Sequence, residues 1–252
     1  MTILLVRSTG VQTGGPLGSG ANSDTASFGA LPAVNNHIIG GLAGWSNDLS
    51  DNGLDNFTDN QSNTYTRHIN PKSVTNQCYA GGSSAKVATS SGTFTVGIDL
   101  TAGTNNYVAW NASEFSGLDT SSWFDQSGIN DSTTGDANAT ASGANATADG
   151  LAVGVCSVNN GDTDINIDDT PPSGYTNLAY YNDGSSIIGY SMVYRIYSSS
   201  ETSAVQWVHD NTSQTGWAAG VMTFKAAGGG GAAGQPTMRR WKNVPFMKVP
   251  GV

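Results

Sequence analysis

Residues 93–100 have the sequence Thr-Phe-Thr-Val-Gly-Ile-Asp-Leu, in which a large apolar side chain stands at every second position. Successive side chains of an extended strand point to opposite faces, so this period of two predicts a strand with one face buried. No stretch of about eleven residues has the i, i+3, i+4, i+7 apolar spacing of an amphipathic helix. The sequence therefore predicts an almost entirely β protein, with one short helical turn near residues 121–125.

Short apolar or alternating segments separated by Asx- and Gly-rich turns continue on both sides of this strand. About ten strands of this kind fit one antiparallel β-sandwich or jelly roll, which we expect over residues 27–226. Within it, residues 128–150 lack large apolar side chains and predict an exposed connection followed by an edge strand. The other strand candidates are residues 37–45, 64–69, 77–79, 85–89, 107–115, 151–158, 186–197, 204–208 and 217–225.

Both ends of the chain differ from this central region. Residues 1–26 are rich in Gly, Ser and Thr without a sustained period, and predict an extended N-terminal arm. Residues 227–252 begin with a run of glycines that predicts a hinge, followed by a basic and aromatic tail. The apolar run at residues 1–6 is too short for a signal-peptide core or a membrane span, so we expect no membrane partner.

Charge is scarce and unevenly distributed over the 252 residues. Charged residues make up 12%, and ten basic against nineteen acidic side chains give a net charge of −9. The tail carries four of the basic residues and no acid, which leaves −13 on the rest of the chain. An acidic body disfavours binding to a phosphate backbone, so we expect no nucleic acid as partner. A basic tail on an acidic body favours self-assembly or docking on an acidic neighbour.

The residues that could carry chemistry do not form a known catalytic motif. The histidines His37, His68 and His209 fall in separate segments, and no Gly-x-Ser-x-Gly elbow occurs. Glycoside hydrolysis needs a pair of carboxylates, but Glu114 and Glu201 are the only glutamates and lie far apart in the sequence. We therefore expect a protein that is not an enzyme.

Metal binding and disulfide formation each have one candidate. Asp162, Asp164 and Asp168 offer oxygen ligands at alternating positions, which fits either a structural Ca²⁺ or a solvated acidic strand. Ile167 stands where a calcium loop of the EF-hand type needs Gly, so we expect no cofactor. Cys78 and Cys156 predict two buried thiols or a single disulfide.

Aromatic side chains at strand spacing have two interpretations. Rings stack well on sugars, so they could form a carbohydrate-binding face, but they equally fill a sandwich core or a subunit interface. The residues concerned are Tyr180, Tyr181, Tyr190, Trp110, Trp123 and Trp207.

The tail from residue 235 interleaves basic and large apolar side chains, and its three prolines disfavour a helix. Burying its large side chains offers about 1.5–3 kcal/mol each, which does not exceed the cost of ordering the chain without a partner. We therefore predict an anchor that binds a neighbouring subunit. Its residues are Met238, Arg239, Arg240, Trp241, Lys242, Phe246 and Met247, and we expect Leu4, Leu5 and Arg7 of the N-terminal arm to reach a neighbour as well.

Three segments together resemble a β-sandwich family of bacteriophage virions and some bacterial surface proteins. They are residues 57–66, with the turn Asp-Asn-Gln-Ser-Asn-Thr-Tyr; residues 112–120, with Glu-Phe-Ser-Gly-Leu-Asp; and residues 193–196 leading to Trp-Ala-Ala-Gly-Val-Met-Thr-Phe at 217–224. The resemblance covers roughly residues 27–226 and implies a structural or adhesive module.

From the residues and the resemblance together, we expect a non-enzymatic virion protein, assembled in the host cytoplasm. Its expected role is to decorate or cement a phage capsid, as a homotrimer that bridges copies of the major capsid protein. The alternative is an adhesion module of the phage tail or fibre that binds host glycans.

Overall fold

The computed structural model describes residues 2–17, 23–46, 54–73, 77–100, 106–133, 135–145, 147–159, 170–182, 188–208 and 216–228. In these residues the chain forms seventeen strands and no helix. Every described pair of strands is antiparallel. The prediction of an all-β, antiparallel protein is confirmed.

The strands form four sheets, two in each half of the chain. Inner sheet 1 has the order β1-β10-β4-β8-β6, with β2 also paired to β10 and β7 to β8. Outer sheet 1 has the order β3-β9-β5. These strands are β1 (Leu4–Ser8), β2 (Gln12–Leu17), β3 (Ser23–Ser27), β4 (His37–Trp45), β5 (Leu54–Asp59), β6 (Thr66–Ile69), β7 (Lys72–Ser73), β8 (Cys78–Lys86), β9 (Thr95–Leu100) and β10 (Asn106–Ser116).

The second half of the chain builds the other two sheets. Inner sheet 2 has the order β11-β17-β13-β15-β14, and outer sheet 2 pairs β12 with β16. These strands are β11 (Phe124–Ser132), β12 (Ala137–Ala144), β13 (Gly150–Asn159), β14 (Thr176–Asn182), β15 (Ile188–Tyr197), β16 (Thr202–Trp207) and β17 (Trp217–Lys225).

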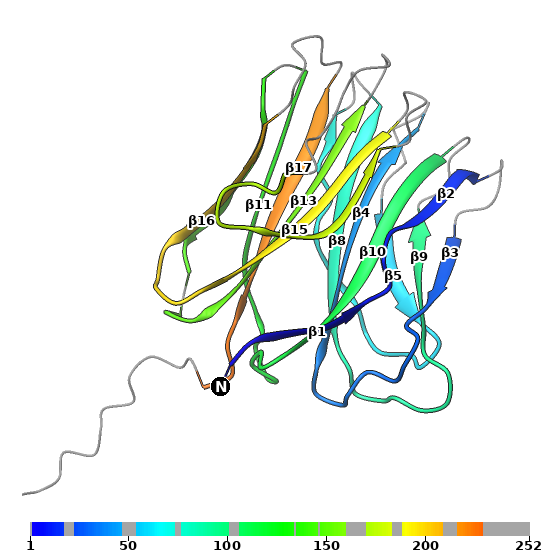
Figure 1. Ribbon diagram of the computed structural model, residues 1–252, viewed down its shortest axis with the longest axis vertical. Coiled ribbons are helices and arrows are strands. Elements are labelled where there is room, and N and C mark those ends of the chain that lie inside the picture. Colours follow the sequence, from blue (N-terminus) through cyan, green and yellow to red (C-terminus); the bar gives the residue numbers. More distant parts are fainter. Residues whose placement is uncertain are drawn as a thin grey trace, which may run out of the picture.

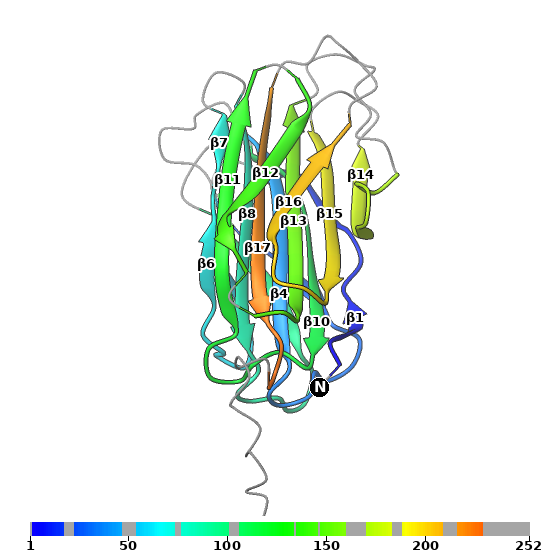
Figure 2. The same cartoon turned by 90° about the vertical axis from the view of Figure 1, so that its left-hand side faces the viewer.

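The four sheets stack as layers, with the two inner sheets face to face and one outer sheet on each side (Figure 1). Figure 2, turned by 90°, looks onto outer sheet 2 with inner sheet 2 behind it. Three apolar cores fill the three spaces between the layers. The middle core joins the halves, and its largest side chains include Tyr190, Met192 and Phe224 of inner sheet 2.

Both faces of the inner sheets are covered, which explains the composition of their strands. In β4 every side chain from His37 to Gly44 is buried, and β8, β13 and β17 are buried in the same way. Gly40 and Gly41 allow close approach on the two faces of β4. A Cβ at Gly40 would collide with the ring of Phe57 from outer sheet 1, and one at Gly41 would lie 2.7 Å from Sδ of Met192.

The two halves have the same topology. In inner sheet 1 the last strand of the first half, β10, lies between β1 and β4. In inner sheet 2 the last strand of the second half, β17, lies between β11 and β13 in the same way. Most of the remaining strands then correspond along the chain, whereas β5 and β7 of the first half have no counterpart among the described strands of the second half. The matched pairs are β1 and β2 with β11, β3 with β12, β4 with β13, β6 with β14, β8 with β15, β9 with β16, and β10 with β17.

The packing between the halves follows this repeat. β4 packs on its own counterpart β13, while β8 packs on β17 and β10 packs on β15. When each strand is replaced by its counterpart in the other half, the contact of β8 with β17 becomes the contact of β15 with β10. The same relation holds between the subunits of a twofold symmetric dimer. The chain is therefore a tandem repeat whose two units pack like the subunits of a dimer.

Three sequence predictions need correction. Residues 1–26 were predicted to form an extended arm, but β1 and β2 pair with β10 of inner sheet 1 and β3 pairs with β9, so these strands belong to the folded body. The helical turn near residues 121–125 is wrong, because residues 120–122 form a bend in which Asp119 accepts hydrogen bonds from the backbone N–H groups of Ser121 and Ser122. The two strands predicted at 77–79 and 85–89 are one continuous strand, β8.

The repeat makes a testable prediction for fragments of the chain. A cut between the exposed residues Thr120 and Ser121 separates the halves, and each half alone exposes one face of the middle core. We expect residues 1–120 and 121–252 to be unstable when expressed singly and to copurify as a folded one-to-one complex when coexpressed.

The control is an equally exposed cut between Ser91 and Gly92, inside the first half, which we expect to give little complex. A folded, monomeric single half, seen by size-exclusion chromatography and circular dichroism, would contradict the dimer-like role of the middle core.

Candidate interaction surfaces

Exposed apolar side chains gather at one end of the molecule. Of the eight large apolar side chains that are exposed in the described residues, three come from β1 and two from the segment between β3 and β4. These five are between 37% and 56% exposed. We call them the base patch: Leu4, Leu5, Val6, Leu31 and Val34. Both segments lie at the end of the body where the N-terminus is marked (Figure 1).

A single buried carboxylate holds the two segments of the base patch together. Glu114 on β10 is fully buried, and its Oε2 lies 2.7 Å from Nε of Arg7. Its Oε1 accepts a hydrogen bond of 2.9 Å from the backbone N–H of Ala33 and another from the side-chain amide of Asn36. Arg7 directly follows the β1 part of the patch, and Ala33 directly precedes Val34. A buried charge with this many partners fixes the geometry of both segments.

Both ends of the described chain meet beside Gly117, three residues after this carboxylate. Gly117 has a φ of +80°, and a Cβ there would collide with the carbonyl oxygen of Thr2. The backbone N–H of Ala227 donates a hydrogen bond of 2.8 Å to the carbonyl of Gly117. The chain therefore enters and leaves the folded body at one place, next to the base patch.

A second surface lies at the seam between the two inner sheets, along their edge strands β6 and β11. We call it the seam groove. It has a volume of about 540 Å³ and is lined by Thr66, Arg67, His68, Ser122, Trp123, Phe124 and Ser127.

Ring contacts and one hydroxyl order this groove. The ring of His68 stacks on Phe124 with centroids 3.9 Å apart and an angle of 6° between the planes. The indole Nε1–H of Trp123 donates to Oγ of Ser84 at 2.9 Å, and that hydroxyl lies 2.8 Å from Nε2 of His68. Ser84 accepts from the indole, so its own proton can be donated to His68, which suits a neutral imidazole.

Two histidines beside the groove are held in the neutral form. Burial lowers the pKa of His68 from 6.5 to about 4. Burial also lowers the pKa of His37 to about 4, helped by the positive charge of Lys86 and opposed by Asp119. His37 is fully buried with its ring 5.0 Å from that of Trp123, and its ring nitrogens have no hydrogen-bond partner within the described part of the chain.

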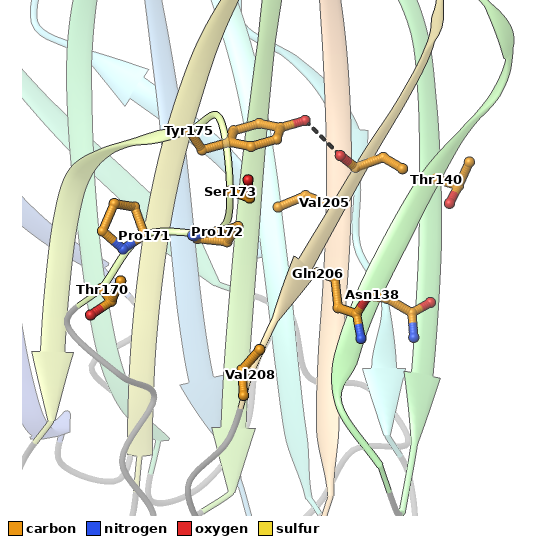
Figure 3. A pocket seen from close by; sticks show the side chains of 11 residues that line it. Asn138, Thr140, Thr170, Pro171, Pro172, Ser173, Tyr175, Val205, Gln206 and Val208 are labelled. Carbon is orange, nitrogen blue, oxygen red and sulfur yellow. Dashed lines mark hydrogen bonds between the residues drawn. The ribbon is translucent and has the colours of Figure 1, made fainter.

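A third surface, the outer groove, lies on the outer side of β12 and β16 (Figure 3). It measures about 830 Å³, and the segment before β14 forms one wall. There the hydroxyl of Tyr175 donates a hydrogen bond of 3.0 Å to the carbonyl of Ala204. The lining residues are Asn138, Thr140, Thr170, Pro171, Pro172, Ser173, Tyr175, Ala204, Val205, Gln206 and Val208.

The structure does not bring the two glutamates together, nor the aromatic residues considered for a carbohydrate-binding face. Glu114 is paired with Arg7 in the first half, whereas Glu201 is paired with Arg195 in the second. Trp110, Trp207 and Tyr190 are buried in the cores, which confirms the core interpretation for them. Trp123 precedes β11 and Tyr180 and Tyr181 lie on β14, at opposite edges of inner sheet 2, so no single aromatic face exists among these residues.

The structure describes the two cysteines, whereas several other predicted site residues lie outside the described chain. Cys78 and Cys156 are free, buried thiols, and burial raises the pKa of Cys78 to about 12. Within the described chain no group of three or more His, Cys, Asp or Glu side chains is placed to hold a metal ion. Asp162, Asp164, Asp168 and His209 lie outside the described residues, and so do the predicted anchor residues Met238, Arg239, Arg240, Trp241, Lys242, Phe246 and Met247.

The sequence predicted only part of the base patch, and it did not predict the buried carboxylate of Glu114 that joins the two segments of the patch. Leu4, Leu5 and Arg7 were predicted to reach a neighbour, and Leu4 and Leu5 are indeed exposed. Arg7 instead forms an ion pair within the chain. Leu31 and Val34 had no sequence signal, because a single apolar residue in a loop is common on any surface.

Comparison of the chain with models of protein families, with curated proteins and with solved structures gives no match. Over the residues that the structure covers, no helix is long and apolar enough to cross a membrane.

The buried neutral histidines predict a loss of stability in acid. His37 and His68 bind a proton more readily in the unfolded chain, where the pKa is near 6.5, than in the folded chain, where it is about 4. The contribution of the two neutral histidines to the free energy of unfolding is complete above pH 6.5 and is lost as the pH falls from 6.5 through 4. By about pH 4.5 we expect each to remove roughly 2–3 kcal/mol from the free energy of unfolding.

Urea unfolding at pH 7 and about pH 4.5 measures this loss. The matched variant His37→Leu/His68→Phe keeps apolar volume but cannot titrate, so its stability should fall less between the two conditions. Equal losses in the variant and the natural protein would place the acid sensitivity elsewhere.

Proposed function

We propose that this chain is a non-enzymatic structural protein of a bacteriophage virion that decorates or cements the capsid by bridging neighbouring capsid subunits. The observation that carries the proposal is that both ends of the described chain, at Thr2 and Ala227, meet beside Gly117 at the base patch. A body attached through that end would project its opposite end outward, as a decoration protein does.

Charge and composition at this end support an anchor. The sequence after Gly228 is the basic and apolar tail, whose Trp241 and Phe246 would bury apolar area on a neighbour while Arg239 and Arg240 pair with its acids. Leu4 and Leu5 of the base patch would contact the same neighbour. Arg7 fixes β1 to the body through Glu114 rather than binding a partner itself.

The repeat topology supports a building block of the kind found in capsids. We infer that each half is a jelly-roll unit, because each inner sheet places its last strand beside its first strand, with β10 between β1 and β4 and β17 between β11 and β13. In each half the strand before the last, β9 or β16, joins the outer sheet. The proposed assembly is a homotrimer that contacts the major capsid protein. The proposed location is the virion, after assembly in the host cytoplasm.

Deleting residues 235–252 tests the proposal. We expect capsids assembled with the shortened protein to lose most copies of it and to release their genome at lower temperature. Two full-length variants separate the causes: Trp241→Ala/Phe246→Ala removes apolar area, and Arg239→Gln/Arg240→Gln removes charge.

Occupancy is measured by quantitative gel densitometry and cryo-electron microscopy of purified particles, with Ile129→Ser on the exposed part of β11 as the control. Full occupancy and unchanged heat resistance after the deletion would refute the anchor.

The seam groove favours a second candidate, an adhesion module that binds host glycans. Trp123 and the stacked pair of His68 and Phe124 offer ring faces to a sugar. Thr66 and Arg67 are exposed at the same place, although Nη1 of Arg67 already donates to the carbonyl of Leu54. Under this candidate a glycan array gives saturable binding that Trp123→Ala abolishes. Tyr181→Ala on the opposite edge should leave it unchanged, and binding that survives Trp123→Ala would exclude the groove.

A further inference from the structure

We propose that in the free protein the base patch is the docking site for the C-terminal segment of the same chain, residues 235–252. The proposal goes beyond the capsid role, because it concerns the state of the protein before it meets a capsid. It assigns a defined surface of the body to a segment that the sequence marks as apolar, basic and extended.

The base patch has the properties of a surface that needs a cover. Among the described strands, β1 forms the edge of inner sheet 1 and pairs only with β10. Edge strands usually carry charges or prolines that prevent pairing with other chains. β1 has no proline, and its one charge, Arg7, is paired with the buried carboxylate of Glu114. Leu4, Leu5 and Val6 are consecutive, so both faces of this edge strand expose apolar side chains.

The place where the tail begins favours an occupant from the same chain. The backbone N–H of Ala227 donates a hydrogen bond to the carbonyl of Gly117. Gly117 stands three residues after Glu114, whose carboxylate holds both segments of the patch. Residues 229–234 are six small residues that can span about 20 Å when extended. A segment tethered this close has an effective concentration on the order of millimolar, well above that of a second copy in dilute solution.

The chemistry of the segment matches the surface. Met238, Trp241, Phe246 and Met247 supply apolar area for the patch. Two acids stand near the end of the described chain, Asp119 with Lys225 beside it, and Asp149, and these acids would pair with cations of the segment. Asp119 donates its backbone N–H to the carbonyl of Lys225, and the carbonyl of Asp149 accepts from the N–H of Ala226, so both side chains start from this exit.

Docking in this way would keep the free protein soluble and leave the anchor available for exchange. A capsid neighbour that buries more of Trp241 and Phe246 than the base patch does would take over the segment. The exposed patch could then contact the same neighbour.

Trypsin digestion of the full chain tests the proposal, because Arg239, Arg240, Lys242 and Lys248 are cleavage sites within the segment. We expect these sites to be cut roughly tenfold more slowly in the protein than in a free peptide of residues 235–252. Leu4→Asp and Val34→Asp, one from each segment of the patch, should raise cleavage to the peptide rate. Ile129→Asp, an equally exposed apolar site on β11, should not.

A cysteine pair tests the same contact independently of the patch variants. Val34→Cys with Phe246→Cys should form a disulfide within one chain upon mild oxidation, while Ile129→Cys with Phe246→Cys should not. Cleavage of the natural protein at the peptide rate would overturn the proposal, and so would protection that the patch variants leave unchanged. Disulfide-linked dimers in place of monomers would assign the patch to a second copy instead.

These outcomes are separate from those of the capsid proposal. If the patch variants release the tail while capsids lacking residues 235–252 in this protein keep full occupancy, the docking site stands and the capsid anchor fails. The reverse result rejects the docking site alone.

Discussion

Covering both faces of the two inner sheets is the constraint on which the rest of this structure depends. A strand in such a sheet has no solvent face, so it cannot use the usual alternation of polar and apolar side chains. β4 and β8 meet this constraint with small residues at the centre, which lets Phe57 approach on one face of β4 and Met192 on the other. The low charge content of the chain follows, because a large share of its strand residues lies between layers.

The same constraint explains which parts of the fold the sequence could predict. β9 belongs to an outer sheet and is half buried, so its period of two was visible and its prediction was confirmed. β4 and β17 are continuous apolar runs bounded by turns, and both were predicted with the observed bounds. In the sequence of β8, Gly81 and Gly82 look like a turn. In the packed layers they leave room for Leu54 and Met222, which the sequence alone does not reveal.

The N-terminal strands were missed for a different reason. β2 contains two glycines and a proline, a composition typical of loops, and such residues are tolerated only because β2 is an edge strand. The repeat was also invisible, since it lies in the order of strand pairing and not in matching side chains. For the candidate surfaces, sequence reasoning found Leu4 and Leu5 but not their partners Leu31 and Val34, which approach only through Glu114.

Glu114 links the architecture to the proposed function. A carboxylate without solvent contact is costly unless its charge is paired, and here Arg7 and two amide donors from the β3–β4 segment supply the partners. These interactions fix the edge strand β1 and the β3–β4 segment relative to one another, so that the two form one surface. Gly117 and both ends of the described chain, Thr2 and Ala227, adjoin that surface. Five of the eight large apolar side chains that are exposed in the described residues lie there. The acidic, Asn-, Ser- and Thr-rich remainder exposes little apolar area, so this end is where a partner, or the chain's own tail, has the most to bury.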